Sequence, residues 1–163
     1  MAESEHSPFQ PTDDSIEALD LAPVARAAAY ELKRLHPAVV FTSGRRDKVG
    51  QARAMASNVV KKRKWIVDTY KASEACSACQ KWVDDHPKAT KQVQIQDGLL
   101  NVFNSLSENQ LGMLSNHLSG NAFDIQPVDQ GAEAIKASIR GLKGLDLFLD
   151  KEGGLIRWHA QFR

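Results

Sequence analysis

Two side chains that could bind a metal ion stand seven positions apart in the segment SNHLSGNAFD, residues 115–124. His117 and Asp124 would lie about 10 Å apart along a helix and more than about 20 Å apart along a strand. Both distances are too large for a single ion that each ligand holds at about 2 Å. Gly120 and Asn121 tolerate a positive φ, so the segment predicts a chain reversal that brings Asp124 back beside His117.

A third ligand is available near the carboxyl end. His159 lies in the run LIRWHAQF, residues 155–162, whose residue types favour a strand. Two neutral imidazoles and one carboxylate suit Zn²⁺ and leave a fourth position for water. A histidine or aspartate taken singly is more often structural, but Asp124 stands between two apolar residues, where a buried carboxylate needs a partner. The sequence therefore predicts one Zn²⁺ ion bound by His117, Asp124 and His159.

The surrounding hydrophobic patterns and turn residues predict the elements that must position these ligands. Short β-prone runs lie at residues 38–41, 122–125 and 155–162, and helix-compatible stretches lie at 14–35, interrupted near Pro23, at 47–112 and at about 132–142. Within the middle stretch we expect breaks near Ser73, at His86-Pro87 and at Asp97-Gly98. These patterns predict an α+β fold, in which a small antiparallel sheet is flanked by helices and the middle of the chain forms a helical insertion.

The composition is that of an ordinary folded domain. The chain has 163 residues, of which 42% are hydrophobic and 25% charged, so we expect a flexible N-terminal arm at residues 1–14 and one domain at residues 15–163. The formal net charge of +1 calls for neither a nucleic-acid partner nor a membrane partner. Since no run approaches the roughly 20 apolar residues that cross a bilayer, we expect no membrane insertion, and we expect a monomer.

Two smaller features leave alternatives open. The basic run Lys61 to Lys64 could touch phosphates or an anionic polymer, but a solvated helix face is the better interpretation. Cys76 and Cys79 could form a redox pair or half of a metal site. We expect them instead to be reduced small residues on a helix, because thiols three positions apart on a regular helix rarely reach disulfide geometry.

The segment at residues 115–124 resembles the signature of the D-alanyl-D-alanine carboxypeptidase family of zinc peptidases, which includes phage L-alanyl-D-glutamate endolysins. That signature is Ser/Thr-x-His-x-x-Gly-x-Ala-x-Asp, and all five fixed positions are matched, by Ser115, His117, Gly120, Ala122 and Asp124. The run Thr42 to Arg46 resembles the family's Thr-Ser-Gly-x-Arg turn, and Trp158-His159 resembles its terminal Trp-His pair. Residues 52–110 match no part of the family pattern.

The resemblance implies zinc, a peptidoglycan stem-peptide substrate, and an arginine that stabilises charge on the substrate, which corresponds to Arg46. It also implies substrate-binding positions at Ser115 and at Gln51, which follows the arginine turn in the next helix. The fold and function expected on this basis are those of a hydrolase, a metallopeptidase that degrades the bacterial cell wall as an endopeptidase or carboxypeptidase.

One departure concerns the general base. The family places an acidic residue three positions before the last histidine ligand, and here that position holds Ile156; a related branch places a histidine two positions before it, where Arg157 stands. Three explanations compete. Glu152, with Asp150 behind it, could reach the site through the flexible turn Gly153-Gly154, another group such as Glu108 could help, or the domain could hold the metal without hydrolysing anything.

Two other functions therefore stand beside the enzyme. One is a catalytically silent zinc-containing module that binds wall peptide or a protein, and the weaker one is a helical nucleic-acid binder using Lys61 to Lys64. The N-terminal residues MAESEH are acidic and polar where a secretory signal needs a basic start, so we expect a product made in the cytoplasm. Action on the wall would then fit a phage lysin or an effector delivered by a secretion machine.

Overall fold

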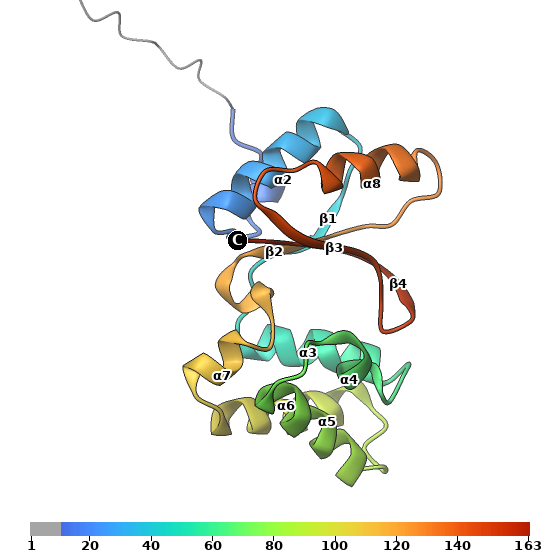
Figure 1. Ribbon diagram of the computed structural model, residues 1–163. Coiled ribbons are helices and arrows are strands. Elements are labelled where there is room, and N and C mark those ends of the chain that lie inside the picture. The colour runs from blue at the N-terminus through green and yellow to red at the C-terminus, as the bar shows by residue number, and fades with distance from the viewer. Residues whose placement is uncertain (1–10) are drawn as a thin grey trace, which may run out of the picture.

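The computed structural model of the protein describes residues 11–163, and a four-stranded antiparallel sheet lies across its middle (Figure 1). The spatial order of the strands is β1-β2-β4-β3, with bounds β1 (Phe41–Ser43), β2 (Ala122–Ile125), β3 (Leu145–Glu152) and β4 (Leu155–Phe162). The prediction of an α+β fold with a small antiparallel sheet is confirmed. Of the expected arm at residues 1–14, residues 1–10 lie outside the described part of the chain.

One face of the sheet is covered by helices α1 (Asp14–Glu17), α2 (Pro23–Leu35) and α8 (Ala132–Arg140), as Figure 1 shows. Proline at the first position of α2 fits a helix start, because its missing N–H would have no partner there. Helix α2 buries one stripe, Ala25, Ala28, Ala29 and Leu32, with the spacing of a single helical face. This stripe packs on a core that includes Phe123, Ile125, Trp158, Ala160 and Phe162 of the sheet.

The other side of the sheet faces the predicted helical insertion, which lies between β1 and β2 in the sequence. Its elements are α3 (Lys48–Val59), α4 (Trp65–Thr69), α5 (Glu74–Asp85), α6 (Gln92–Ser105) and α7 (Glu108–Gly112). They enclose a second apolar core, to which Met55, Trp65, Cys79, Leu99 and Phe103 belong. The breaks expected near Ser73 and at His86-Pro87 are confirmed, because Ser73 caps the start of α5 and His86 its end.

The break expected at Asp97-Gly98 is wrong, since α6 runs through both residues without interruption. Glycine usually weakens a helix interior, but here a Cβ at position 98 would overlap the ring of Trp82 on α5. Helix α6 therefore contains a glycine because α5 approaches it closely.

Two strand predictions need correction. The run 38–41 enters the sheet later than expected, because β1 spans Phe41–Ser43, although the Val40 carbonyl still accepts a hydrogen bond from the Gln126 N–H. The sequence did not predict β3 at all. Its pairing partner β4 follows after Gly153 and Gly154, which both have positive φ, so the expected turn is the tip of a β-hairpin.

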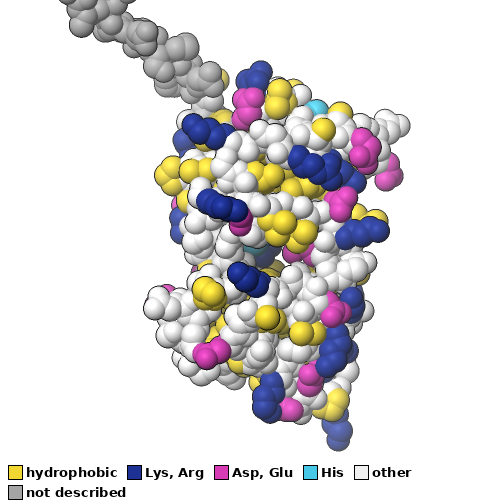
Figure 2. Space-filling view, viewed as in Figure 1, with side chains coloured by type: hydrophobic (Ala, Val, Ile, Leu, Met, Phe, Trp, Pro, Cys, Tyr) yellow, Lys and Arg dark blue, Asp and Glu magenta, His cyan; other side chains and the backbone are white. Residues whose placement is uncertain are grey.

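The two cysteines are free and buried on α5, and burial raises the pKa of both thiols, so they behave as apolar core groups. The basic run lies in the turn between α3 and α4 and not on a helix face, and three of its residues, Lys62, Arg63 and Lys64, make structural contacts. Arg63 donates to the carbonyls of Val83, His86 and Ala89, and Lys64 pairs with Asp84. Basic and acidic side chains are interspersed over this half of the molecule in Figure 2. No helix in the described part of the chain is long and apolar enough to span a bilayer.

Candidate metal centre

His117 is placed by a tight turn before β2. It lies in a short 3₁₀ helix, η1 (Asn116–Ser119), whose first N–H groups are capped by the Ser115 hydroxyl, which accepts from the His117 N–H at 3.2 Å. Gly120 ends this turn with φ 77°, in the left-handed region, and a Cβ there would lie 2.7 Å from the Arg45 guanidinium. The predicted reversal is present, with Gly120 as the residue of positive φ.

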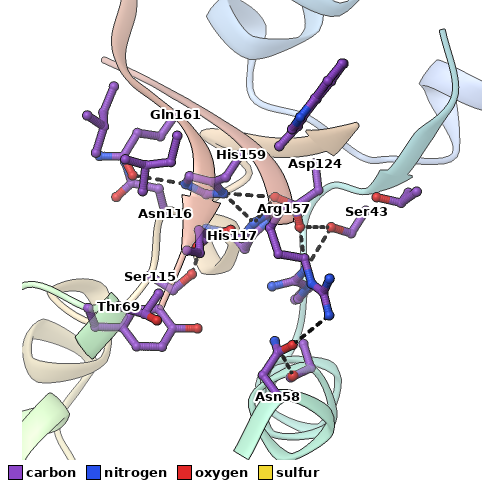
Figure 3. Close-up of a pocket in the computed structure, with 18 of the residues that line it drawn as sticks. Ser43, Asn58, Thr69, Ser115, Asn116, His117, Asp124, Arg157, His159 and Gln161 are labelled. Carbon is purple, nitrogen blue, oxygen red and sulfur yellow. Dashed lines mark hydrogen bonds and ion pairs between the residues drawn. The ribbon is translucent and has the colours of Figure 1, made fainter. Parts of the chain in front are cut away.

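Asp124 and His159 are brought together by strand register. They are direct partners across β2 and β4, and Ser43 on β1 is the partner of Asp124 on its other side. Directly opposed residues of an antiparallel pair have Cβ atoms about 4.5–5.5 Å apart. A row of side chains therefore runs across the sheet from Ser43 through Asp124 to His159, and η1 places His117 against it (Figure 3).

Three ligand atoms converge in this buried cluster. His117 Nε2 lies 3.2 Å from His159 Nδ1 and 3.3 Å from Asp124 Oδ1, and His159 Nδ1 lies 2.9 Å from the same oxygen. Ligands at about 2.0–2.1 Å in a tetrahedral zinc site would be about 3.3 Å from one another. The spacing fits a tetrahedral ion, and the group could hold a metal.

The outer hydrogen bonds determine which nitrogen of each imidazole carries its proton. His117 Nδ1 faces the Gly44 carbonyl at 2.8 Å, and a carbonyl can only accept, so Nδ1 donates and Nε2 presents a lone pair. His159 Nε2 faces Gln161 Oε1 at 3.1 Å, while the amide nitrogen of Gln161 donates to Asp146. His159 Nδ1 therefore also presents a lone pair when the ring is neutral, and three electron pairs meet at one point.

The titration behaviour of the cluster follows from burial and mutual charge. Burial lowers the pKa of His117. Burial alone would raise the pKa of Asp124, but the charges and hydrogen bonds of the two histidines outweigh it and hold the pKa well below 3.8. Burial would lower the pKa of His159, whereas its hydrogen bond to Asp124 raises it, with a net rise. The carboxylate stays ionised, as a metal ligand must.

Arg46 lines the pocket and also forms a hydrogen bond to Asp124, one of the three candidate ligands. Its Nη2 donates to Asp124 Oδ2 at 2.8 Å and to the Ser43 hydroxyl, which also donates to that oxygen. Gln51 is fully buried, accepts from Arg46 Nη1 and donates to the Tyr70 hydroxyl. The structure thus places Gln51 behind Arg46 and away from the pocket wall; substrate contacts from Arg46 and Ser115 stay predictions.

The metal centre lies at the floor of a cavity of about 720 Å³ between the sheet and the helical insertion. Figure 2 shows the surface hollowed between these two halves. Ser115, Arg46 and Glu152 line the cavity. Ile156, in the position where the family pattern has its base, is 62% exposed at the rim.

Glu152 occupies the pocket because of the β3–β4 hairpin. The pairing register shifts between Leu149 and Lys151, after which Glu152 pairs with Leu155 at the end of the hairpin. Burial raises the pKa of Glu152, partly offset by the positive charges of His159 and Arg46. The other two candidates for the general base lie outside the pocket lining. Asp150 pairs with Lys136, and Glu108 is exposed at the start of α7.

Gln161 is a site residue that the sequence analysis did not predict, as is Ser43, which donates to Asp124. Gln161 lies beside His159 in Figure 3, orients its ring through Nε2, and is itself held by Asp146, which pairs with Arg163. Alternation along β4 puts residues 159 and 161 on one face, and that pattern could have revealed it.

Comparison of the chain with protein-family profiles, curated proteins and solved structures found no match.

Proposed function

We propose that the protein is a zinc-dependent peptidoglycan peptidase that hydrolyses an amide bond of a stem peptide, as an endolysin-like endopeptidase or a carboxypeptidase. The observation that carries this proposal is the convergence of three lone pairs from His117, Asp124 and His159 at tetrahedral spacing. When both imidazole rings are neutral, such an arrangement is repulsive without a cation at its centre. His117, Gly120 and Asp124 are also fixed positions of the signature by which the sequence resembles zinc peptidases acting on the cell wall, and His159 matches the terminal Trp-His pair of that family.

Zinc is the ion that this donor set favours, because two imidazole nitrogens and one carboxylate oxygen are the ligand types of catalytic zinc sites, and His117, Asp124 and His159 would hold it. When bound, zinc supplies Lewis acidity, which polarises a carbonyl and lowers the pKa of coordinated water toward about 7. One ion per chain is expected, and every ligand comes from one polypeptide, which is consistent with a monomer.

Glu152 is the base that the pocket offers. Its carboxylate lines the cavity, and its raised pKa brings it closer to neutrality, where a carboxylate accepts a proton from water and passes it to a leaving amine most effectively. A positioned base contributes about 100- to 10,000-fold to rate. Arg46 donates to Asp124 and so orients it, and because Arg46 also lines the cavity its guanidinium can stabilise negative charge that develops on a substrate.

The cavity has the size of a small-molecule or short-peptide site, since ligand pockets commonly measure about 300–1,000 Å³. Ser115 at its wall has a hydroxyl that caps η1 and could also bond a peptide backbone.

The test is hydrolysis of isolated cell walls by the zinc-loaded protein, read as new amino termini or released peptides. The wild type should cleave, and Glu152→Gln should lose at least about 100-fold in rate while it keeps one zinc per chain. Glu108→Gln is the matched control and should cleave like the wild type. Zinc-loaded wild type that binds muropeptides without turnover would contradict the enzyme and favour the silent binding module.

A further inference from the structure

Arg157 is a positive charge in the pocket that the proposed mechanism does not use. It lies on β4, two residues before His159, and lines the cavity opposite α3. Its Nη1 donates to the Ile156 carbonyl at 2.9 Å, and its Nη2 donates to Asn58 Oδ1 at 3.2 Å, as Figure 3 shows for Asn58. Both acceptors are neutral, so these two hydrogen bonds hold the guanidinium in place without an ion pair, although its charge also acts on Glu152, which lines the same cavity.

The two arginines that line the cavity differ in their partners. Arg46 pairs with Asp124 at 2.8 Å, whereas no carboxylate of the described residues lies within ion-pair distance of Arg157. The acids that line the cavity are Asp124, which the two histidines and Arg46 already engage, and Glu152, which feels the charges of His159, Arg46 and Arg157 but forms no ion pair with Arg157. A divalent cation at the metal centre would add two further positive charges, so the loaded pocket favours an anionic occupant.

We infer that Arg157, oriented by Asn58, is the carboxylate-binding subsite of this pocket, and that it selects peptides carrying a carboxylate near the scissile amide. This inference rests on the proposed function for the identity of the substrate. The planar guanidinium has five N–H donors in a fork that matches a carboxylate, and the hydrogen bonds to Ile156 and Asn58 leave donors available. The fixed anchor lowers the entropic cost of binding.

The alternative is a purely structural bridge, in which Arg157 only ties β4 to α3 through Asn58. A bridge of that kind affects stability but does not distinguish a charged peptide from a neutral one. Charge selectivity in binding therefore separates the two roles.

The experiment measures binding by calorimetry in the zinc-loaded Glu152→Gln background, which slows cleavage. The ligands are the stem tetrapeptide L-alanyl-γ-D-glutamyl-L-lysyl-D-alanine and the same peptide with its carboxylates converted to carboxamides. We expect the acid form to bind about 10- to 100-fold more tightly, because a charge-assisted bidentate contact is lost in the amide. Arg157→Gln should abolish most of this difference, and Arg157→Lys should restore part of it.

Lys71→Gln is the matched control, since it removes the same charge from an exposed side chain lining the same cavity. It should leave the preference largely intact. If Arg157→Gln keeps the full preference with zinc and fold intact, or if Lys71→Gln abolishes it equally, the subsite is overturned. Cleavage is scored separately with the wild-type protein: absence of hydrolysis with the binding preference present would refute the peptidase and leave the subsite standing.

Discussion

The two oxygens of Asp124 have different partners, and this division is central to the site. Oδ1 faces the lone pairs of His117 and His159, while Oδ2 accepts hydrogen bonds from Ser43 and Arg46. The carboxylate is thereby oriented for an ion on one side and held by a cation on the other. The sequence pattern predicted the ligand but could not predict this orientation, which depends on β1 lying beside β2.

Gln161 should tune the metal affinity without touching the metal. Gln161→Leu removes the acceptor that fixes the tautomer of His159, so zinc affinity should fall about 10- to 100-fold. Competition with a fluorescent chelator measures this. Gln126→Leu, at an exposed glutamine lining the same pocket, should leave the affinity unchanged, and equal losses in both variants would refute the positioning role.

The buried carboxylate of Glu152 should make stability depend on pH. Folding favours its protonated form, because burial raises its pKa above 4.5, so its contribution to stability is present below that pH and is lost as the pH rises through the raised pKa. In metal-free protein, Glu152→Gln should therefore gain stability relative to the wild type as the pH rises from 4.5, the ordinary pKa of a glutamate, through the raised pKa of Glu152. Urea unfolding across the range measures it; a difference independent of pH would contradict the assignment.

Among the elements, the β3–β4 hairpin connects the helical insertion to the pocket. Its tip rests on α4, where a Cβ at Gly153 would overlap Thr69 and Trp65, and Lys62 Nζ donates to the Gly153 carbonyl at 2.6 Å. This contact positions Glu152, the neighbouring residue. The sequence predicted the turn from Gly153-Gly154, but the strand before it was missed, because its register depends on contacts with β4.

Gly153→Ala should lower the rate of wall hydrolysis and leave zinc bound. The new Cβ adds a clash with α4 to the strain of a positive φ, which costs about 1–3 kcal/mol for a residue other than glycine. Gly154→Ala is the control, since it shares the positive φ and meets only the flexible Lys62 side chain. The hydrolysis rate of each variant, normalised to zinc content, checks this, and equal rates would argue against a positioning role for the hairpin tip.

Helix packing in the insertion explains another error of the sequence-based prediction. Gly98 was expected to break a helix, since glycine disfavours helix interiors, but the tertiary contact with Trp82 requires the missing side chain. Local propensity could not reveal this requirement.

Gly98→Ala should therefore destabilise the protein by about 1–3 kcal/mol, although alanine is the better helix former. The free energy of unfolding in urea measures the effect. Gly112→Ala, where nothing lies within 4 Å of the new Cβ, should change stability little or raise it slightly. A stabilised Gly98→Ala variant would show that the contact with Trp82 is loose.

At the scale of the whole molecule, two apolar cores lie on opposite sides of the pocket, one between the sheet and α2, the other inside the helical insertion. Hydrogen bonds cross the gap from Arg157 to Asn58 and from Lys62 to the Gly153 carbonyl, and Leu155 of β4 packs on the core of the insertion. Local sequence patterns predicted the α+β class, the helical insertion and the grouping of His117, Asp124 and His159. They could not predict which of Glu152, Asp150 and Glu108 reaches the pocket, because that choice depends on packing between the halves.

The most direct test of this account is the zinc content of the intact protein, measured by native mass spectrometry after metal removal and reloading. Wild type should take up one zinc ion per chain, and His117→Ala, Asp124→Ala and His159→Ala should each lose it while the fold, checked by circular dichroism, remains. A folded wild-type protein that takes up no zinc, or ligand variants that bind it as tightly as the wild type, would contradict the metal centre.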